Sequence, residues 1–421
     1  SLKVEEHELY VADGLLTHNS IYAFRGAVPE YAVYFTRYFP EGRIIELEYN
    51  YRCPKNIIEL GNDLMDQAKW KFSRTKAHRT DDGHIQYYDS FLDGDEEADA
   101  VVEEIVTLSK KSGVEYRDIA ILYRTNAQSR PLEEALIRRA IPYKVEQSFY
   151  NSAEIKDMVS FIKYISDDTD MEALKRVVNK PNRYLGQSFV GQLQEKAKSM
   201  SLIEALKSGS FSHSYMNTNA LDFATQIEYV RGLELDTVGS YMTVIRERLK
   251  YDDWIMDNHE ESVAVEKVEK LNELATLANH FKTIKEFLEY LAKLDGSAVG
   301  DANAVELKTI HRSKGLEFKV IFVIGVSEKI LPHARATDAE EERRLLYVAI
   351  TRAIERVYLS HVLTRFNQEV EPSRFLKELG FDAGYDDLTE EIVDGKIGTV
   401  NEAFRKEIMQ EIRDIQNDIH L

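Results

Sequence analysis

The chain has 421 residues, enough for two or three domains, and is 43% hydrophobic and 30% charged. Its single cysteine, Cys53, excludes an internal disulfide framework, and no apolar run is long enough to span a membrane. The formal net charge of −19 excludes a protein that coats nucleic acid by bulk attraction, so any contact with DNA has to lie in a local groove.

The first residues alternate apolar and polar side chains around Asp13-Gly14, which predicts a β-hairpin. Residues 11–19, VADGLLTHN, are followed directly by Ser20 and resemble the C-terminal end of an intein. An N-terminal hairpin without any splicing function is the alternative interpretation.

The intein resemblance implies a role for each polar residue of this stretch. Asn19 is expected to cyclise and cut the Asn19–Ser20 bond, and His18 to transfer the proton that this step needs. Ser20 is expected to accept the upstream protein segment, with His7 assisting. Because an intein N-terminal nucleophile is absent from the sequence, we expect either splicing in trans with a separate N-terminal piece or a truncated gene.

Residues 20–27, SIYAFRGA, resemble motif III of the UvrD/Rep/PcrA family of superfamily-one DNA helicases. The resemblance implies that Tyr22 and Phe24 stack on bases of single-stranded DNA, and that Arg25 links the DNA to a nucleotide site. Without the motif, a position in a protein core against Tyr31, Tyr34 and Phe35 is the preferred interpretation of both aromatic side chains.

Residues 43–48 predict a short strand, and YNYR at 49–52 follows at its carboxyl end, where ligands bind in open α/β sheets. YNYR resembles motif IV of the same family. The resemblance implies that Arg52 acts as an arginine finger on the γ-phosphate of ATP and that Tyr51 stacks on the adenine.

Strand and helix patterns alternate from 84 to 147, which predicts a parallel sheet with helices on both faces. The expected strands and helices are, in order, 84–90, 96–111, 118–124, 131–140 and 143–147. The family resemblance of YRTNAQSR at 123–130 implies that Asn126 lies on the DNA side, with a helix N-cap as the alternative role.

Apolar residues at spacings of three and four predict helices throughout residues 152–297. In the family this position is occupied by the mobile 2B subdomain. A similar stripe in the acidic segment 382–421 predicts an amphipathic helix there.

Residues 309–318, TIHRSKGLEF, resemble motif V of the family. Lys314-Gly315 is predicted to open a helix whose N-terminal amides suit an anion. By resemblance, Gly315 and Glu317 contact the nucleotide, whereas Thr309, His311 and the more distant His333 lie on the DNA side.

The apolar run 320–326 predicts a strand buried on both faces, followed by a helix that carries Arg352. Its guanidinium has two possible partners, an anionic ligand or a nearby glutamate. Residues 341–353, EERRLLYVAITRA, resemble motif VI, which implies that Arg352 is a second arginine finger on the γ-phosphate.

Together these patterns predict an α/β fold: a RecA-like parallel-sheet motor domain, 2A, with a large helical 2B insert. The expected segments are the intein fragment 1–19, the end of the first motor domain 20–43, the first part of 2A 44–151, the 2B insert 152–297, the second part of 2A 298–381 and the acidic tail 382–421.

No GxxxxGKS or GxxxxGKT loop and no DExx strand occur in the sequence. We therefore expect the C-terminal half of a cytoplasmic ATP-dependent 3′–5′ DNA helicase, in a bacterial or phage-infected cell, that is inactive alone. Its expected partners are DNA and an N-terminal half with an intein N-fragment, which would hold the Mg²⁺ that accompanies ATP; no metal ligand and no membrane contact are predicted here. The alternative function is a non-catalytic DNA-binding or regulatory subunit.

Overall fold

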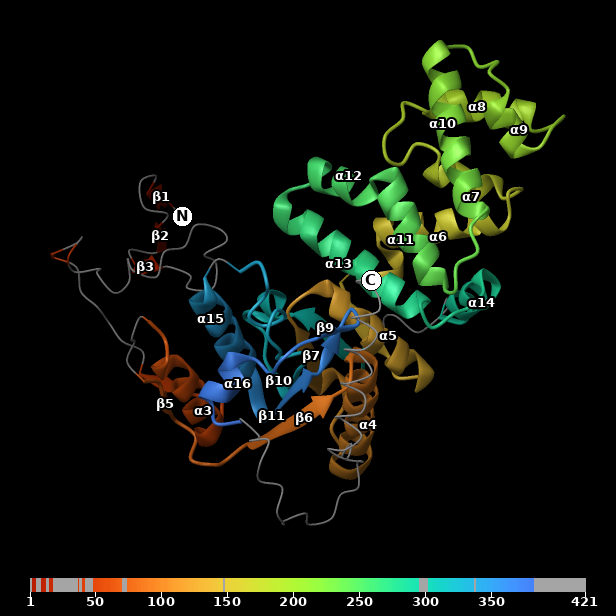
Figure 1. Ribbon diagram of the computed structural model, residues 1–421. Coiled ribbons are helices and arrows are strands. Elements are labelled where there is room, and N and C mark those ends of the chain that lie inside the picture. Colours follow the sequence, from red (N-terminus) through yellow and green to blue (C-terminus); the bar gives the residue numbers. More distant parts are fainter. Residues whose placement is uncertain are drawn as a thin grey trace. The chain divides into compact units, whose positions relative to one another are not determined.

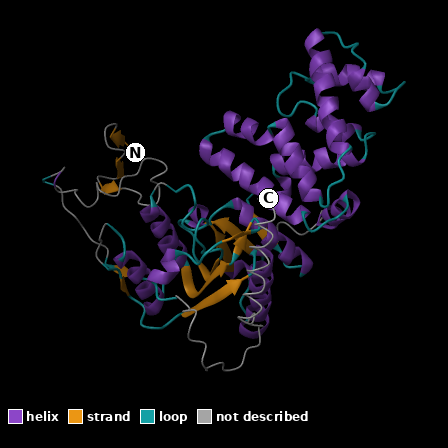
Figure 2. Ribbon diagram, in the orientation of Figure 1, coloured by secondary structure: helices purple, strands orange, loops and turns teal. Residues whose placement is uncertain are grey.

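The computed structural model describes residues 2–4, 9–12, 15–17, 37, 40–41, 48–69, 74–146, 148–294, 302–336 and 338–381. The chain divides into two compact units, Ser1–Arg124 with Lys308–Leu421 and, between them in sequence, Thr125–Leu307. We call the first the sheet unit and the second the helical unit. Figure 2 shows why: most strands belong to the former, and long helices dominate the latter.

Four parallel strands form the centre of the sheet unit. Their order is β6 (His84–Phe91), β11 (Ala353–Val362), β10 (Phe318–Val323) and β7 (Ile119–Tyr123). Residues 320–323 of β10 are buried, as expected for an inner strand with side chains on two covered faces. The predictions of a parallel α/β sheet and of a doubly buried strand are therefore confirmed.

Helices cover both faces of these strands (Figure 1). On one face, α3 (Lys55–Asp66), α15 (Ala339–Ile350) and α16 (Arg374–Glu378) share a core with Ile321 and Val357. On the other, α4 (Gly94–Ser112) packs against β6 and β11, where Tyr358 donates a hydrogen bond of 3.0 Å to Glu104. The helix predicted at 96–111 is thus confirmed.

The ends of α4 follow from its sequence. The Asp93 carboxylate accepts hydrogen bonds of 3.0 Å from the backbone N–H groups of Asp95 and Glu96, so it caps the first turn. Gly113 ends the helix with a φ of +65°, a conformation that glycine adopts without strain.

One carboxylate of α4 is fully buried. Glu97 accepts hydrogen bonds from the Gly325 N–H (2.9 Å) and the Ser360 hydroxyl (2.7 Å), two residues near the carboxyl ends of the strands. Burial raises the pKa of Glu97 to about 7, more than these two hydrogen bonds lower it. The side chain therefore takes up a proton on folding at mildly acidic pH.

We expect a Glu97→Gln variant to lose part of the pH dependence of stability. A raised carboxyl pKa means that the folded state binds more protons than the unfolded state between the two pKa values, so its stability falls as pH rises. The wild type should lose about 2 kcal/mol more of unfolding free energy than the variant between pH 5 and pH 8. Urea unfolding at both pH values measures this difference, and parallel pH profiles would contradict it.

Short strands complete the sheet unit. β4 (Tyr49–Asn50) and β5 (Lys76–Ala77) pair in parallel, while β12 (Thr364–Arg365) and β13 (Gln368–Glu369) form a hairpin. At the N-terminus β1 (Leu2–Val4), β2 (Leu9–Ala12) and β3 (Leu15–Thr17) pair antiparallel, with Ala12 opposite Leu15. The predicted hairpin pairing is confirmed. The predicted strand at 43–48, except for Glu48, and the amphipathic tail 382–421 lie outside the described residues.

The helical unit begins with η3 (Asn126–Gln128), α5 (Ser129–Arg138), β8 (Tyr143–Val145) and η4 (Phe149–Asn151), and β8 pairs in parallel with β9 (Val305–Thr309). Between them every described element is a helix: α6 (Ala153–Ser166), α7 (Met171–Val177), α8 (Gln187–Lys196), α9 (Leu202–Lys207), α10 (Ser214–Arg231), α11 (Val238–Leu249), α12 (Tyr251–Asn258), α13 (Glu261–Ala278) and α14 (Ile284–Leu294). The helical pattern matches the prediction, whereas the assignment as a 2B insert stays a prediction. No helix within the described ranges is long and apolar enough to cross a membrane.

One predicted helix is wrong. Lys314-Gly315 does not open a helix; η5 (Ile310–Ser313) ends there, and the chain turns into β10 at Phe318. Gly315 has a φ of +85°, which is incompatible with a right-handed helix. A site for an anion in this segment must therefore rely on side chains rather than on a helix N-terminus.

Candidate functional site

The residues predicted around a phosphate gather at the amino-terminal edge of the parallel sheet. Lys314 to Glu317 precede β10 and Arg352 precedes β11, and Phe318 lies opposite Ala353 in the register of these strands. The sequence prediction had placed the ligand at a carboxyl end. That holds only for the short strand β4, after which Tyr51 and Arg52 follow, and not for β10 and β11 of the parallel sheet.

Arg352 lies just beyond helix α15 and not on it, which corrects the predicted position. The helix ends at Ile350, and β11 begins at Ala353, so Arg352 occupies the turn between them. Its Nε donates to the Val348 carbonyl (3.1 Å) and its Nη1 to the Leu316 carbonyl (3.2 Å). A half-buried guanidinium is thus held by two backbone oxygens, neither of which neutralises its charge.

Arg52 reaches the same place from a distant part of the sequence. The Asn50 side chain accepts hydrogen bonds of 2.9 Å from the N–H groups of Arg52 and Cys53, which shapes the turn after β4. The Arg52 guanidinium then donates through Nε to Glu317 (2.7 Å) and through Nη1 to the Thr351 carbonyl (3.1 Å). The structure therefore brings together Arg52, Glu317 and Arg352, three of the predicted nucleotide-site residues.

Positive charge dominates this cluster. Burial lowers the pKa of Arg352, and the neighbouring charge of Arg52 lowers it further. Burial also lowers the pKa of Lys314, followed by the charge of Arg352. Arg52, Arg352 and Lys314 thus place three positive charges near one another, and the carboxylate of Glu317, whose side chain is 56% exposed, pairs with Arg52. An anionic ligand would relieve the repulsion between the two guanidinium groups.

The buried thiol of Cys53 lies in the electrostatic field of the same arginines. Its Sγ lies 3.4 Å from the Thr351 carbonyl, and three arginines, Arg52, Arg352 and Arg79, act on it electrostatically. Burial nevertheless outweighs them and raises the pKa of Cys53 to about 11, so the thiol is neutral at physiological pH. Cys53 therefore fills space and does not act as an anion of the site.

Tyr51 and Gly315 flank the cationic cluster. Tyr51 is 69% exposed, and its ring centroid lies 4.4 Å from that of His78. An exposed aromatic ring next to Arg52 suits stacking on a planar ligand, and the role of Tyr51 at an adenine stays a prediction. Gly315 has open space around it, so its positive φ, and not a close contact, explains the glycine.

A second cluster occupies the carboxyl edge of the same sheet. Arg124 follows β7 and forms a two-pronged ion pair with Glu342 of α15, through Nε (2.9 Å) and Nη2 (2.8 Å). The Glu342 carboxylate also accepts a hydrogen bond of 3.0 Å from the backbone N–H of His333. Burial, and next the charge of Arg124, lower the pKa of His311 to about 4, so this imidazole is neutral at physiological pH.

The structure also describes two other predicted DNA-side residues, Asn126 and Thr309. Asn126 is in the helical unit, where its side-chain amide donates to Glu266 (2.8 Å). Thr125, together with Gln128, caps η3, so the alternative role of Asn126 as an N-cap is wrong. Thr309 is the N-cap of η5 but forms no side-chain capping bond.

The remaining predicted site residues lie outside the described part of the chain; they are Tyr22, Phe24, Arg25, His7, His18, Asn19 and Ser20. Conversely, sequence reasoning missed two residues that shape the cationic cluster, Asn50 and Arg79. Asn50 lies inside the motif IV string and could have been identified as a turn residue, whereas no sequence signal marks Arg79.

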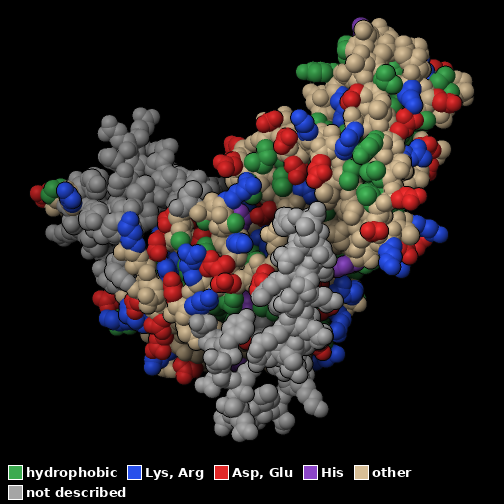
Figure 3. All heavy atoms as spheres, in the orientation of Figure 1, with side chains coloured by type: hydrophobic (Ala, Val, Ile, Leu, Met, Phe, Trp, Pro, Cys, Tyr) green, Lys and Arg blue, Asp and Glu red, His purple; other side chains and the backbone are tan. Residues whose placement is uncertain are grey.

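The mixed charge of the described surface fits a binding site that is confined to a small area. On the face shown in Figure 3, basic and acidic side chains of the described residues are intermixed. Within the described ranges, no three His, Cys, Asp or Glu side chains are arranged to hold a metal ion.

Comparison with known proteins identifies similar sequences. Residues 45–364 match the family described as UvrD-like helicase C-terminal domain. The ATP-dependent DNA helicase PcrA of Staphylococcus epidermidis is 33% identical over 387 residues, which cover 86% of this chain and 53% of that protein. PcrA of Staphylococcus aureus is 33% identical over 388 residues with the same coverage. The chain therefore spans about half the length of the curated relatives it matches.

Proposed function

Because the chain belongs to the family of UvrD-like helicase C-terminal domains, we propose that it is the C-terminal part of an ATP-dependent DNA helicase. In this proposal it supplies Arg52 and Arg352 to the γ-phosphate of ATP. The P-loop and acidic strand that hold the other phosphates and Mg²⁺ belong to an N-terminal portion. We call the two portions together the assembled helicase.

The observation that carries the proposal is the convergence of two guanidinium groups, 300 residues apart in sequence, at one edge of the sheet. Arg52 contacts Glu317 and the Thr351 carbonyl, one residue before Arg352. Bound phosphate oxygens would accept hydrogen bonds from both arginines and offset their repulsion. The charge that develops on the γ-phosphate during hydrolysis would then be stabilised electrostatically, with Glu317 and Gly315 shaping the site and Tyr51 stacking on the base.

The opposite edge of the sheet is the proposed DNA side. Thr309, His311 and His333 are the residues proposed to contact single-stranded DNA there. By family resemblance, Tyr22, Phe24, Arg25 and Asn126 are further proposed DNA contacts, whose position relative to this edge is not part of the proposal. Because His311 is neutral, it would act as a hydrogen-bonding group and not as a phosphate-neutralising cation. Negatively charged DNA backbone would find its cationic partners elsewhere in the groove.

Helix α15 offers a rigid connection between the two edges. Glu342 lies in the first turn of α15 and belongs to the second cluster, at the proposed DNA side. Arg352 lies two residues beyond the end of α15 and belongs to the cationic cluster. The eight helical steps from Glu342 to Ile350 span about 12 Å. Closure of the two motor domains on ATP, and their opening after hydrolysis, would therefore shift the DNA-side residues and move the strand 3′ to 5′.

We further propose that the N-terminal portion is joined by protein splicing. His18 would assist the cyclisation of Asn19, Ser20 would accept the upstream segment, and His7 would support the first step. The antiparallel pairing of β2 with β3 around Asp13-Gly14 fits this proposal, although a simple hairpin has the same pairing. The proposed location is the cytoplasm of a bacterial or phage-infected cell.

The test is to mix this chain with an N-terminal portion that carries the P-loop and an intein N-fragment, and to measure mass and DNA-stimulated ATP hydrolysis. We expect a ligated product whose C-terminal segment begins at Ser20, and ATPase activity that neither piece has alone. Activity without ligation would refute splicing and retain the helicase. DNA binding without any ATPase would refute the helicase and favour the non-catalytic DNA-binding or regulatory subunit.

A further inference from the structure

The residues that follow β5 lie beside those that follow β4. Tyr49 pairs with Lys76 and Asn50 with Ala77, so the register continues to Tyr51 beside His78 and Arg52 beside Arg79. The His78 N–H donates to the Asn50 carbonyl (2.8 Å), which extends the pairing by one step. Strand β5 thereby places a third arginine, Arg79, beside Arg52, one of the two proposed arginine fingers.

One nitrogen of Arg79 joins the two segments that carry this pair. Its Nη1 donates to the carbonyl of Arg52 (2.8 Å) and to the carbonyl of Ile354, two residues after Arg352 (2.6 Å). Both acceptors are backbone oxygens, so Arg79 fixes the positions of the chains and does not compete for the ligand. Hydrogen bonds from a charged donor are roughly twice as strong as those between neutral groups.

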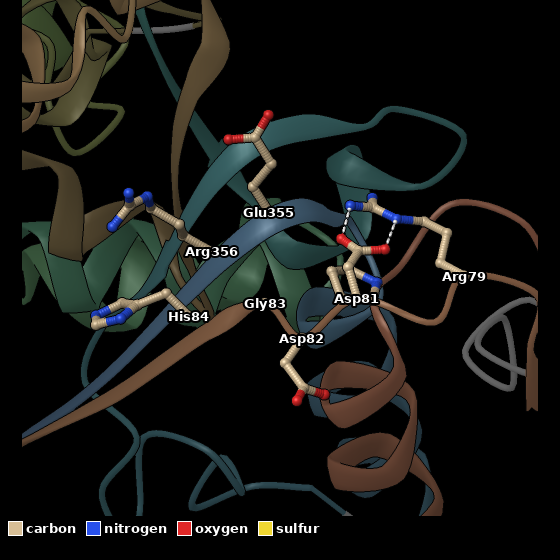
Figure 4. A pocket seen from close by; sticks show the side chains of 8 residues that line it. Arg79, Asp81, Asp82, Gly83, His84, Glu355 and Arg356 are labelled. Carbon is tan, nitrogen blue, oxygen red and sulfur yellow. Dashed lines mark hydrogen bonds and ion pairs between the residues drawn. The ribbon is translucent and has the colours of Figure 1, made fainter.

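The other side of the Arg79 guanidinium is held by Asp81. Nε lies 2.9 Å from one carboxylate oxygen, and Nη2 contacts the other, as the dashed lines in Figure 4 show. Arg79 is 26% exposed and Asp81 is 55% exposed. The carboxylate thus orients the fork so that Nη1 points at the two carbonyls, a geometry that the single ammonium of lysine cannot reproduce.

The loop that carries Arg79 is itself fastened to the sheet unit. The Lys55 N–H donates to the Asp81 carbonyl (3.0 Å), and the Asn56 side chain makes two hydrogen bonds of 2.7 Å with the backbone of Gly83. A Cβ on Gly83 would lie 2.7 Å from the Glu355 carbonyl oxygen, so only glycine permits this approach to β11. Arg79 therefore acts from a rigid support.

We propose that Arg79 is a positioning residue that sets the separation of Arg52 and Arg352 before the phosphate binds. The proposal rests on the proposed function of these two arginines. Burial and the charge of Arg52 both disfavour the charged form of Arg352, so the two groups repel when no ligand is present. Because Arg79 holds the carbonyls of Arg52 and Ile354, it keeps the two guanidinium groups in place against this repulsion. The site then needs no rearrangement to reach the transition state.

The test is an Arg79→Gln variant of the assembled helicase, assayed for single-stranded-DNA-stimulated ATP hydrolysis. We expect kcat to fall roughly 10- to 100-fold, because a displacement of about 1 Å has effects of this size. The KM for ATP should change less than about 3-fold, because the interaction matters mainly in the transition state. Arg79→Lys should restore only part of kcat, since one ammonium replaces the fork.

The matched control is Arg74→Gln, which removes another arginine of the same unit from an exposed pair with Asp63 and Asp66. It should leave both constants unchanged. The decisive measurement is Arg79→Gln in an Arg52→Ala, Arg352→Ala background. If Arg79 acts through the two arginines, it causes no further loss there; a general loss of folded protein would lower the rate again by the same factor.

Three outcomes overturn the inference, and they separate it from the proposed function. An unchanged kcat in Arg79→Gln, alongside large losses in Arg52→Ala and Arg352→Ala, refutes the positioning role alone. Full activity of Arg52→Ala and Arg352→Ala refutes the proposed function, and the inference with it. If Arg79→Gln does not fold, Arg79→Lys decides, because wild-type kcat in that variant contradicts a need for the fork.

Discussion

Replacing Arg352 by alanine is expected to reduce DNA-stimulated ATP hydrolysis by the assembled helicase about 1,000-fold, mainly in kcat. The guanidinium is anchored on the Val348 and Leu316 carbonyls, and these neutral acceptors leave its charge available to a phosphate. In the proposed function, removing it takes away a charge placed where negative charge develops on the γ-phosphate. Steady-state kinetics at saturating DNA measures the effect.

Two further variants make this prediction specific. Arg352→Lys should recover little activity, because a lysine keeps the charge but cannot bind a phosphate through two parallel hydrogen bonds. Arg117→Ala is the matched control, since it removes an exposed arginine that pairs with Glu115 in the same unit. Wild-type kcat in Arg352→Ala would show that this arginine has a structural role only, as an ion-pair interpretation of the sequence also allows.

Local patterns predicted the elements of the sheet unit well. The apolar run at 320–326 contains most of β10, and the helix predicted at 96–111 lies within α4. Both predictions succeed because an uninterrupted apolar run and an N-cap such as Asp93 are signals carried by residues adjacent in sequence. The motif strings also identified Arg52, Glu317 and Arg352, which the structure brings together.

Features that depend on distant contacts were not predictable in the same way. The sequence of motif VI continues its helical pattern through Arg352, yet β11 takes over at Ala353 because it pairs with β10 and β6. The helix expected at Lys314-Gly315 fails because Gly315 turns the chain into β10. Arg79 has no recognisable motif, since its function depends on two carbonyls that are 27 and 275 positions away in sequence.

Replacing Glu342 by glutamine is expected to lower the unfolding free energy of the sheet unit by about 3 kcal/mol. Glu342 is 3% exposed and neutralises Arg124, which is 21% exposed, through two short hydrogen bonds. The variant would remove the carboxylate that Arg124 contacts through these hydrogen bonds, and taking one partner out of a largely buried ion pair is costly. Urea unfolding of this chain measures the loss.

Glu59→Gln is the matched control for this prediction. It makes the same substitution on helix α3, in an exposed pair with Lys55 at 3.7 Å, and should cost less than about 0.5 kcal/mol. Equal stability losses in the two variants would show that burial of the Arg124–Glu342 pair is unimportant.

The Glu342→Gln variant also tests whether α15 connects the two edges of the sheet. Glu342 fixes the backbone of His333 and opposes the effect of Arg124 on the pKa of His311, so its loss should disturb the proposed DNA side first. In the assembled helicase with Glu342→Gln, half-saturation should then require a several-fold higher concentration of single-stranded DNA, measured at temperatures where the variant is folded. If only stability changes, the pair holds the fold together and the DNA contacts lie elsewhere. If DNA affinity and kcat both fall, α15 connects the two edges of the sheet as a single rigid element.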